Sequence, residues 1–346
     1  MQSAQNATIL KNNPRLALVG CGAIAENYYL PVFANYPTLL ANVIFVDRDE
    51  NRAKELAVKY KAANYAANYQ EVLGRVDGVI VAVPTHLHYM ITRDCLAYGV
   101  PVLCEKPLAD TAENARNLVQ LASEKKVALA VNYLQRLVPA FAKVKEMLEQ
   151  KSLGEPLSIQ YYVGEEFNWP TASGFYFNAP LSARGILRDR GAHAMDHICW
   201  WLAGKPRLIS SMNDAWGGSD AVSQVFFESG KCRGELKLSW LVSFPCTFKV
   251  TCENGTIEGK VYDYQNLDIR AGNGKKKKVR LHAKEKTKID IARRIVGNFV
   301  EVVCSGAKPL ISGNEVLDSL DFIDECYASA VRFDMPWYET LEVQHK

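Results

Sequence analysis

The sequence predicts two domains: an α/β domain built on a doubly wound parallel sheet over residues 1–131, and an α+β domain over residues 132–346. A chain of 346 residues is longer than one hydrophobic core usually serves. In the first part, short apolar runs alternate with helix-type segments. After residue 131 the composition shifts toward aromatic residues and toward the period-two alternation of half-buried strands.

In the first domain, strands and helices follow one another as a parallel sheet requires. Apolar runs bounded by turn residues predict strands at 15–19, 43–46, 62–65, 78–82, 101–104 and 127–131. Helical periodicity predicts helices at 49–60, 87–98 and 111–125. Asp49 is the expected cap of the first of these helices, and Gly99 is expected to close the second. Six strands with intervening helices match a dinucleotide-binding sheet.

The second domain is predicted to begin with a helix at 141–150. Alternating patterns predict strands at 157–162, 222–228, 234–240, 248–252 and 256–261. A helix from about Asp189 to Leu202 lies between the first two of these strands. A basic loop follows the last strand, and two helices at 290–305 and 314–332 come after it.

The first strand is followed by the spacing G-x-G-x-x-A, at Gly20, Gly22 and Ala25. Gly20 would allow the tight turn, Gly22 would let the backbone approach a pyrophosphate, and Ala25 would keep helix and strand close. The pyrophosphate would lie on the helix N-terminus, at Ala23 and Ile24. A glycine pair after a strand also occurs in ordinary turns, so this motif needs a second signal.

The second signal is Asp47, which follows the strand 43–46 and lies 22 residues after Ala25. An acidic residue at this strand end is placed to bind the adenosine ribose hydroxyls and to repel a 2′-phosphate, so NAD is favoured over NADP as the cofactor. Arg48 beside it could stack on adenine or accept a phosphate. The same acidic segment fits a helix N-terminus, and both interpretations can hold together.

Ligands of doubly wound sheets bind at the carboxyl ends of the strands. Three loops there supply the further candidate cofactor-binding residues: Pro84, Thr85 and His88 in the first, Glu105 and Lys106 in the second, and Asn132 in the third. A lysine next to a bound nicotinamide could stabilise the alkoxide that forms as a hydride leaves an alcohol. The alternative is that Lys106, which precedes a proline, is simply solvated.

The helix that begins near Asp189 places this residue, His193 and Asp196 on one face. A carboxylate one turn before an imidazole is a candidate acid/base element, although a solvated polar face gives the same pattern. His193 and His197 with the two aspartates also offer metal-ligand types. Because His197 points away from the middle of this face and no His-Glu-x-x-His pattern occurs, we expect no metal.

The segment before this helix is rich in aromatic residues and carboxylates, among them Glu165, Trp169 and Tyr176. Such a segment can stack on a sugar ring and hydrogen-bond its edges, which makes these three residues candidate substrate contacts. The alternative is that the aromatic rings anchor an irregular loop over the domain junction.

Three arginines, Arg184, Arg188 and Arg190, precede His193. They could hold a phosphate or carboxylate of the substrate, and Arg188 is a candidate substrate-binding residue together with Asp189 and His193. They could also simply pair with the neighbouring glutamates at 165 and 166.

Four motifs in order resemble the glucose-fructose oxidoreductase and inositol dehydrogenase family, Gfo/Idh/MocA: G-x-G-x-x-A, then P-x-x-x-H at Pro84 and His88, then Glu105-Lys106-Pro107, then D-x-G-x-H-x-x-D from Asp189 to Asp196. Each motif alone is common, but their order is specific. The resemblance implies a mainly antiparallel open sheet in the second domain, whose open face joins a homodimer or homotetramer. It also implies a cis bond between Lys106 and Pro107.

The resemblance further implies an enzyme that transfers hydride between a secondary alcohol of a sugar, cyclitol or glycoside and a nicotinamide cofactor. His193 would exchange the hydroxyl proton, Lys106 would stabilise the alkoxide, and Asp189 would orient the substrate and raise the basicity of the imidazole. Glu105 would reach the nicotinamide ribose, and Asn132 would touch the substrate or the nicotinamide amide. Two rival functions are an NAD-retaining enzyme that cleaves glycosides and a non-catalytic dinucleotide-sensing regulator.

Composition excludes several other classes. A net charge of +3 disfavours nucleic acid or an anionic membrane as the main partner. No stretch approaches the roughly 18 apolar residues of a membrane span. The nine cysteines are scattered and form no Cys-x-x-Cys pair, which is typical of reduced thiols and, with a polar N-terminal stretch, predicts a cytoplasmic protein. The run from Lys275 to Lys278 is expected to be a solvated hairpin loop without a function.

Overall fold

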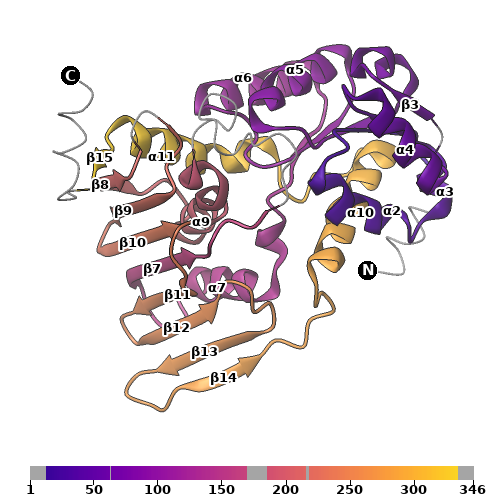
Figure 1. Ribbon diagram of the computed structural model, residues 1–346. Coiled ribbons are helices and arrows are strands. Elements are labelled where there is room, and N and C mark those ends of the chain that lie inside the picture. Colours follow the sequence, from indigo (N-terminus) through magenta and orange to yellow (C-terminus); the bar gives the residue numbers. More distant parts are fainter. Residues whose placement is uncertain (1–12, 63, 170–184, 216–217, 334–346) are drawn as a thin grey trace, which may run out of the picture.

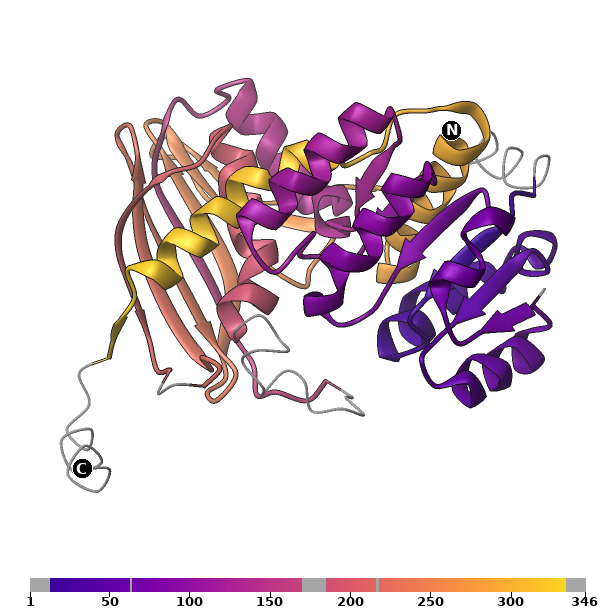
Figure 2. The same ribbon diagram turned by 90° about the horizontal axis from the view of Figure 1, so that it is seen from above.

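The computed structural model describes residues 13–62, 64–169, 185–215 and 218–333. These residues form a six-stranded sheet and a nine-stranded sheet. Helices pack against both sheets, as Figures 1 and 2 show from two sides. The predicted fold class is confirmed, since every strand pair of the first sheet is parallel and most pairs of the second are antiparallel. None of the described helices is long and apolar enough to cross a membrane.

The first sheet has the strand order 3-2-1-4-5-6 of a doubly wound dinucleotide-binding domain. Its strands are β1 (Leu16–Val19), β2 (Val43–Val46), β3 (Asn64–Ala66), β4 (Gly78–Val81), β5 (Val102–Cys104) and β6 (Leu129–Val131). All residues of the four central strands β1, β2, β4 and β5 are buried, which explains why they read as continuous apolar runs. The weakly signalled third strand begins two residues later than predicted.

Helices cover both faces of this sheet, with α5 and α6 on one side and α2 beside α10 on the other (Figure 1). The first-domain helices are η1 (Ala25–Tyr29), α2 (Leu30–Phe33), α3 (Pro37–Leu40), α4 (Glu50–Tyr60), η2 (Tyr69–Glu71), η3 (Leu73–Arg75), η4 (Thr85–Leu87), α5 (His88–Tyr98) and α6 (Ala112–Lys125). Asp49 caps α4 as predicted, because its carboxylate accepts the N–H groups of Asn51 and Arg52. Gly99 closes α5 at a φ of 94°.

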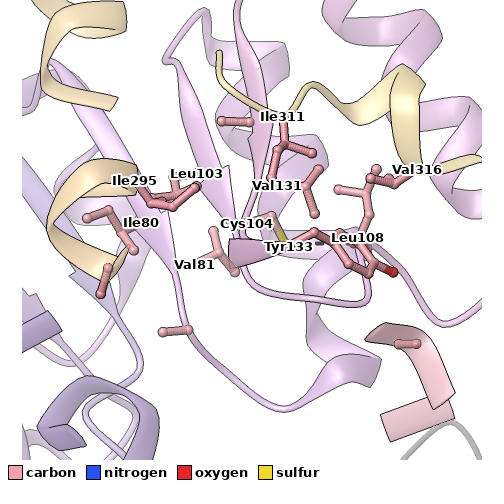
Figure 3. Close-up of a cluster of buried hydrophobic side chains, with 14 of the residues drawn as sticks. Ile80, Val81, Leu103, Cys104, Leu108, Val131, Tyr133, Ile295, Ile311 and Val316 are labelled. Atoms are coloured by element: carbon pink, nitrogen blue, oxygen red, sulfur yellow. Dashed lines mark hydrogen bonds between the residues drawn. The ribbon is translucent and has the colours of Figure 1, made fainter. Parts of the chain in front are cut away.

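One helix of the second half of the chain returns to the first sheet. This helix, α10 (Lys288–Ser305), contacts η1 and α2, and a Cβ on Gly78 of β4 would lie 2.6 Å from Val303 and 3.2 Å from Phe299. Figure 3 shows Ile295 of α10 against Ile80 and Leu103 of the sheet. The described buried side chains of both halves therefore form one continuous hydrophobic cluster.

Within the described residues, helices cover one face of the second sheet and leave the other open, as Figure 2 shows at the left. Its strands, in sheet order, are β14 (Lys277–Arg280), β13 (Asn266–Ala271), β12 (Gly255–Lys260), β11 (Phe244–Cys252), β7 (Pro156–Gly164), β10 (Cys232–Ser239), β9 (Val222–Ser229), β8 (Arg207–Asn213) and β15 (Val331–Arg332). The covering helices are α7 (Pro139–Glu149), α9 (Ile186–Leu202) and α11 (Leu317–Ala328), and two short 3-10 helices, η5 (Leu134–Leu137) and η7 (Gly313–Val316), complete the described helices.

Four strands were not predicted from the sequence: β8, β13, β14 and β15. The basic loop expected after β12 contains instead a hairpin of two strands, β13 and β14. Lys275 and Lys276 lie in the turn of this hairpin, and Lys277 and Lys278 belong to the edge strand β14. The whole run from Lys275 to Lys278 is exposed, as expected, and lysines at a sheet edge discourage pairing with other chains. The single helix predicted at 314–332 is divided into η7, α11 and β15.

A buried ion pair fixes α9 against the end of the parallel sheet. The guanidinium of Arg136 in η5 donates to both carboxylate oxygens of Asp196, at 2.8 and 2.7 Å. A further bond of 2.9 Å reaches the carbonyl of Glu315 in η7. Arg136 is 6% exposed and Asp196 is 1% exposed, so water cannot replace either partner.

We expect Asp196→Ala to lower the free energy of unfolding by about 3–5 kcal/mol, because it leaves the buried guanidinium of Arg136 with only the exposed carboxylate of Glu315, 3.6 Å away, as a counter-charge. Urea titration followed by circular dichroism measures this change. The control is Asp318→Ala, which removes an exposed carboxylate at the start of α11. A loss no larger than that of the control would contradict a structural role for the pair.

Candidate active site

A pocket of about 1730 Å³ lies where the two halves of the chain meet. Its walls are the glycine loop after β1, the carboxyl ends of β2, β4, β5 and β6, the N-terminal half of α9, and the segment after β12. The carboxyl ends of parallel strands are where ligands of doubly wound sheets bind. The described residues among the predicted site residues line this one pocket, namely Gly20, Gly22, Ala23, Ile24, Asp47, Arg48, Pro84, Thr85, His88, Glu105, Lys106, Asn132, Glu165, Trp169, Arg188, Asp189 and His193.

The glycine loop has the shape that a pyrophosphate requires. Gly20 has a φ of 101°, and a Cβ there would lie 2.3 Å from the carbonyl oxygen of Ala82, so only glycine fits. A Cβ on Gly22 would meet nothing within 4 Å, because this backbone faces open space. The N–H of Glu26 donates to the Gly22 carbonyl, so the N–H groups before Glu26 lie at a helix N-terminus. These residues fit a dinucleotide phosphate.

Asp47 holds the glycine loop and faces the same end of the pocket. Its Oδ2 accepts the N–H of Cys21 at 2.8 Å, and its Oδ1 accepts the N–H of Asp49 at 3.0 Å. Each oxygen keeps a second lone pair for a ribose hydroxyl. Arg48 is exposed beside it. The sequence did not single out Arg52, which donates from Nε to the carbonyl of Cys21 and so supports the loop from α4.

His88 ties together two of the loops at the strand ends. Its ring nitrogens lie 2.7 Å from the carbonyl oxygen of Pro107 and 2.8 Å from that of Val83. Burial lowers the pKa of His88, and the two carbonyl oxygens oppose this shift. The bond between Lys106 and Pro107 is cis, as the family resemblance implied.

Glu105 is buried at the end of β5 within a small hydrogen-bond network. Its Oε1 accepts the hydroxyl of Tyr29 at 2.7 Å and the side-chain amide of Asn132 at 2.6 Å. Burial raises the pKa of Glu105, and these hydrogen bonds oppose that shift. The Oδ1 of Asn132 is buried and has no partner among the described residues, so an acceptor beside the pocket is free for a ligand.

Lys106 and Asp189 form an ion pair across the junction of the two domains. The ammonium of Lys106 donates to Oδ1 of Asp189 at 2.8 Å and to the backbone carbonyl of the same residue at 3.0 Å. The Lys106 side chain is 16% exposed and the Asp189 side chain 24% exposed, so both remain accessible to a ligand in the pocket. The alternative of a solvated lysine is wrong.

His193 lies one turn after Asp189 on the pocket wall, with the ring of Tyr133 edge-on at 5.9 Å. Burial lowers the pKa of His193 well below its usual range, and the positive charge of Lys106 adds to this effect. The expectation that Asp189 raises the basicity of this imidazole is therefore wrong, because the carboxylate of Asp189 binds Lys106. The Nδ1 of His193 is buried without a partner among the described residues.

His197 belongs to the core and not to the pocket. Its Nδ1 lies 3.0 Å from the hydroxyl of Tyr161, and its ring stacks on Trp201 with centroids 5.6 Å apart. No cluster of three or more potential metal-ligating side chains occurs within the described ranges. The four side chains considered as ligands lie apart: Asp189 and His193 in the pocket, Asp196 in the ion pair with Arg136, and His197 in the aromatic core.

The start of α9 is fixed by residues that the sequence analysis missed. Asp220, just before β9, accepts the N–H groups of Gly185 and Leu187 and the hydroxyl of Tyr327. A Cβ on Gly185 would lie 1.9 Å from the carbonyl oxygen of Asp220, so glycine is required. This cap comes from a distant loop, and no local sequence signal announces it.

Among the candidate substrate contacts, Glu165 belongs to a network with Tyr262 and Arg190. Glu165 accepts the hydroxyl of Tyr262 at 2.8 Å and lies 3.6 Å from the guanidinium of Arg190, which donates to the same hydroxyl at 3.0 Å. Arg190 thus pairs with a glutamate as the alternative interpretation had it, while Glu166 is exposed. The sequence did not single out Tyr262 or Lys288, although both line the pocket.

Arg188 does not pair with these glutamates. It binds Asp324 of α11 and stacks on the ring of Tyr327, and it is only 3% exposed. Its position on the pocket wall is consistent with a role in substrate binding, but its charge already has a partner. Trp169 lines the pocket, whereas Tyr176 and Arg184 lie outside the described residues.

Two family profiles match the chain. The profile described as "Oxidoreductase family, NAD-binding Rossmann fold" covers residues 14–133, and the profile "GFO/IDH/MocA C-terminal domain" covers residues 141–258. The first range ends next to the predicted domain boundary. The glycine loop and Asp47 therefore belong to an NAD-binding Rossmann domain.

Similar proteins support the same assignment. The rhizopine catabolism protein MocA of Rhizobium meliloti is 33% identical over 56% of this chain, and the matched stretch covers 58% of that relative's own length. The trans-1,2-dihydrobenzene-1,2-diol dehydrogenase of Mus musculus is 28% identical over 70% of this chain and 73% of its own. The structure of levoglucosan dehydrogenase with NADH and levoglucosan has the same fold, with a TM-score of 0.79 over 91% of this chain and 96% of that one at 17% identity. The chain thus belongs to the Gfo/Idh/MocA family of oxidoreductases.

Proposed function

We propose that this protein is an NAD-dependent dehydrogenase that oxidises a secondary alcohol of a sugar, cyclitol or glycoside. The observation that carries the proposal is the convergence of Lys106, Asp189 and His193 on the wall of a pocket whose other end is a dinucleotide loop. The names of similar proteins, which include levoglucosan and D-xylose dehydrogenases, support a sugar-like substrate.

In this reaction His193 and Lys106 have different roles. Because burial keeps His193 neutral, its imidazole can accept the proton of the substrate hydroxyl. Lys106, held by Asp189, places an ammonium where the resulting alkoxide forms. NAD bound at the glycine loop supplies the acceptor for the hydride that leaves the carbinol carbon. In reduction the same groups act in reverse, with His193 returning the proton.

The residues at the nicotinamide end have positioning roles in this proposal. Glu105, fixed by Tyr29 and Asn132, is placed to accept a ribose hydroxyl. The free Oδ1 of Asn132 is an acceptor for the amide N–H of the nicotinamide. We also propose a homodimer or homotetramer joined by the open face of the nine-stranded sheet, and a cytoplasmic location, which the nine free thiols favour.

The direct experiment incubates the purified protein with NAD and a panel of sugars, sugar acids, inositols and glycosides, and follows NADH absorbance. Formation of NADH with a polyol supports the dehydrogenase. Release of an aglycone without net NADH would support the glycoside-cleaving alternative, and NAD binding without any turnover would support a dinucleotide sensor.

Lys106→Ala and His193→Ala should each lower kcat by about 10²–10⁴-fold, since each removes a group that stabilises charge or moves a proton in the transition state. The dissociation constant of NAD, measured by fluorescence titration, should change little. Lys125→Ala, at the exposed end of α6, is the matched control for a lost lysine. Normal turnover in both active-site variants would refute the assignment.

The imidazole of His193 should take up a proton only well below pH 6.5, because its neutral form is favoured by burial and by neighbouring cations. It therefore stays able to accept a proton as the pH falls through the neutral range, and loses this ability only at lower pH. NMR titration of protein labelled in its histidines measures this, with His193→Gln identifying the signal. Titration near 6.5 would show that the ring is solvated.

Asp47→Asn should weaken NAD binding by about tenfold, or 1.4 kcal/mol, and should reduce the preference for NAD over NADP. The amide keeps the size of the side chain but removes the charge that repels a 2′-phosphate. Glu50→Gln, which removes an exposed charge just inside α4, is the control. If the cofactor preference of Asp47→Asn equals that of the control, Asp47 does not face the ribose.

A further inference from the structure

One cationic side chain of the pocket wall lacks a carboxylate partner. Among the described residues, four cationic side chains line the pocket around the domain junction: Lys106 from the first domain, and Arg188, Arg190 and Lys288 from the second. Three have a carboxylate partner: Asp189 for the first, Asp324 for the second and Glu165 for the third. Lys288 has no carboxylate within 4.0 Å in the part of the chain that the structure describes. The other pocket carboxylates, Glu26, Asp47, Asp49 and Glu105, belong to the first domain.

Lys288 and Arg190 converge on one tyrosine. The ammonium of Lys288 lies 5.8 Å from the ring centroid of Tyr262, while Arg190 donates to the hydroxyl of the same residue at 3.0 Å. Burial and the positive charge of Arg190 lower the pKa of Lys288, and the more distant carboxylate of Glu165 opposes this shift only in part. Two cations held this close repel each other, and an anion between them would remove the repulsion. Only one of the five N–H groups of the guanidinium is used by Tyr262.

A second cavity of about 500 Å³ continues from this point and shares Tyr262 and Lys288 with the main pocket. It carries Arg280 and Lys286 in addition. Its one carboxylate, Asp263, already accepts hydrogen bonds from the backbone and the side chain of the turn that follows it. With Arg280, Lys286 and Lys288 against this one carboxylate, the net charge of the extension is positive.

We propose that the substrate carries an anionic group, a carboxylate or a phosphate, which Lys288 binds together with Arg190 at the mouth of this extension. The proposal rests on the proposed alcohol oxidation and names the class of substrate: sugar acids or sugar phosphates. The reacting hydroxyl lies at Lys106 and His193, and the anionic group is directed away from the dinucleotide end. Charge-assisted hydrogen bonds to a carboxylate or phosphate are roughly twice as strong as neutral ones.

The test compares neutral and acidic compounds in matched pairs: glucose with glucuronate, and sorbitol with gluconate. Glucose 6-phosphate is compared with glucose in the same way, which shows whether the site binds a phosphate or a carboxylate. With NAD present, kcat/KM should be at least about tenfold higher for the anionic member of a pair, mainly through a lower KM. Equal values for both members of every pair would overturn the proposal.

Lys288→Gln should lower the ratio of anionic to neutral kcat/KM by about tenfold, and Lys288→Glu should reverse the preference. Lys284→Gln removes a charge from the same segment but from an exposed residue that lines neither cavity, so it should keep the wild-type ratio. A ratio that is the same in all three variants and the wild type would contradict the role of Lys288.

The two proposals can fail separately. If no compound yields NADH, the proposed oxidation fails, and calorimetric titration of the NAD-loaded protein with gluconate and with inorganic phosphate still tests the anion site. If Lys288→Gln weakens this binding about tenfold, the result supports the proposed anion site. If neither anion binds, or if Lys288→Gln leaves the binding unchanged, the proposed anion site is wrong.

Discussion

The ion pair between Lys106 and Asp189 is the interaction on which the candidate site depends, because its two members come from different domains. Lys106 follows β5 of the parallel sheet, and Asp189 lies in the first turn of α9, which packs on the other sheet. The ammonium is held by the side chain and by the backbone of the same aspartate, so its position is set by where α9 lies. A shift of this helix relative to the first domain would displace Lys106 and His193 together.

Two buried arrangements keep α9 in that place. Asp220 and Tyr327 satisfy the N–H groups at its start, and Arg136 binds Asp196 two turns further on. None of these groups needs to touch a ligand, yet each contact restrains the position of the helix. The polar face that the sequence assigns to this helix is therefore mostly internal: its charges hold the helix, and the Asp189–His193 part faces the pocket.

The first domain was predictable because local sequence and tertiary structure agree there. Strands buried on both faces must be apolar throughout, and a tight turn against Ala82 must be glycine, so β1, β2, β4, β5, β6 and the loop at Gly20 leave clear signals, whereas the partly exposed β3 leaves a weak one. Edge and half-exposed strands such as β8 and β14 carry polar or basic residues and leave none. The site was predictable where motifs are contiguous. Asp220 and Lys288 reach it from distant segments, and the low pKa of His193 depends on burial that no local pattern records.

The return of α10 to the parallel sheet matters for how the chain folds during synthesis. The face of the sheet near Gly78 and Ile80 is covered by Phe299 and Ile295, which leave the ribosome long after β6 is complete. A nascent chain that has finished its six parallel strands still exposes this apolar face until every strand of the second sheet except β15 has been made. Exposed apolar faces of this kind are prone to aggregation, so the parallel sheet stays vulnerable until one late helix has been made.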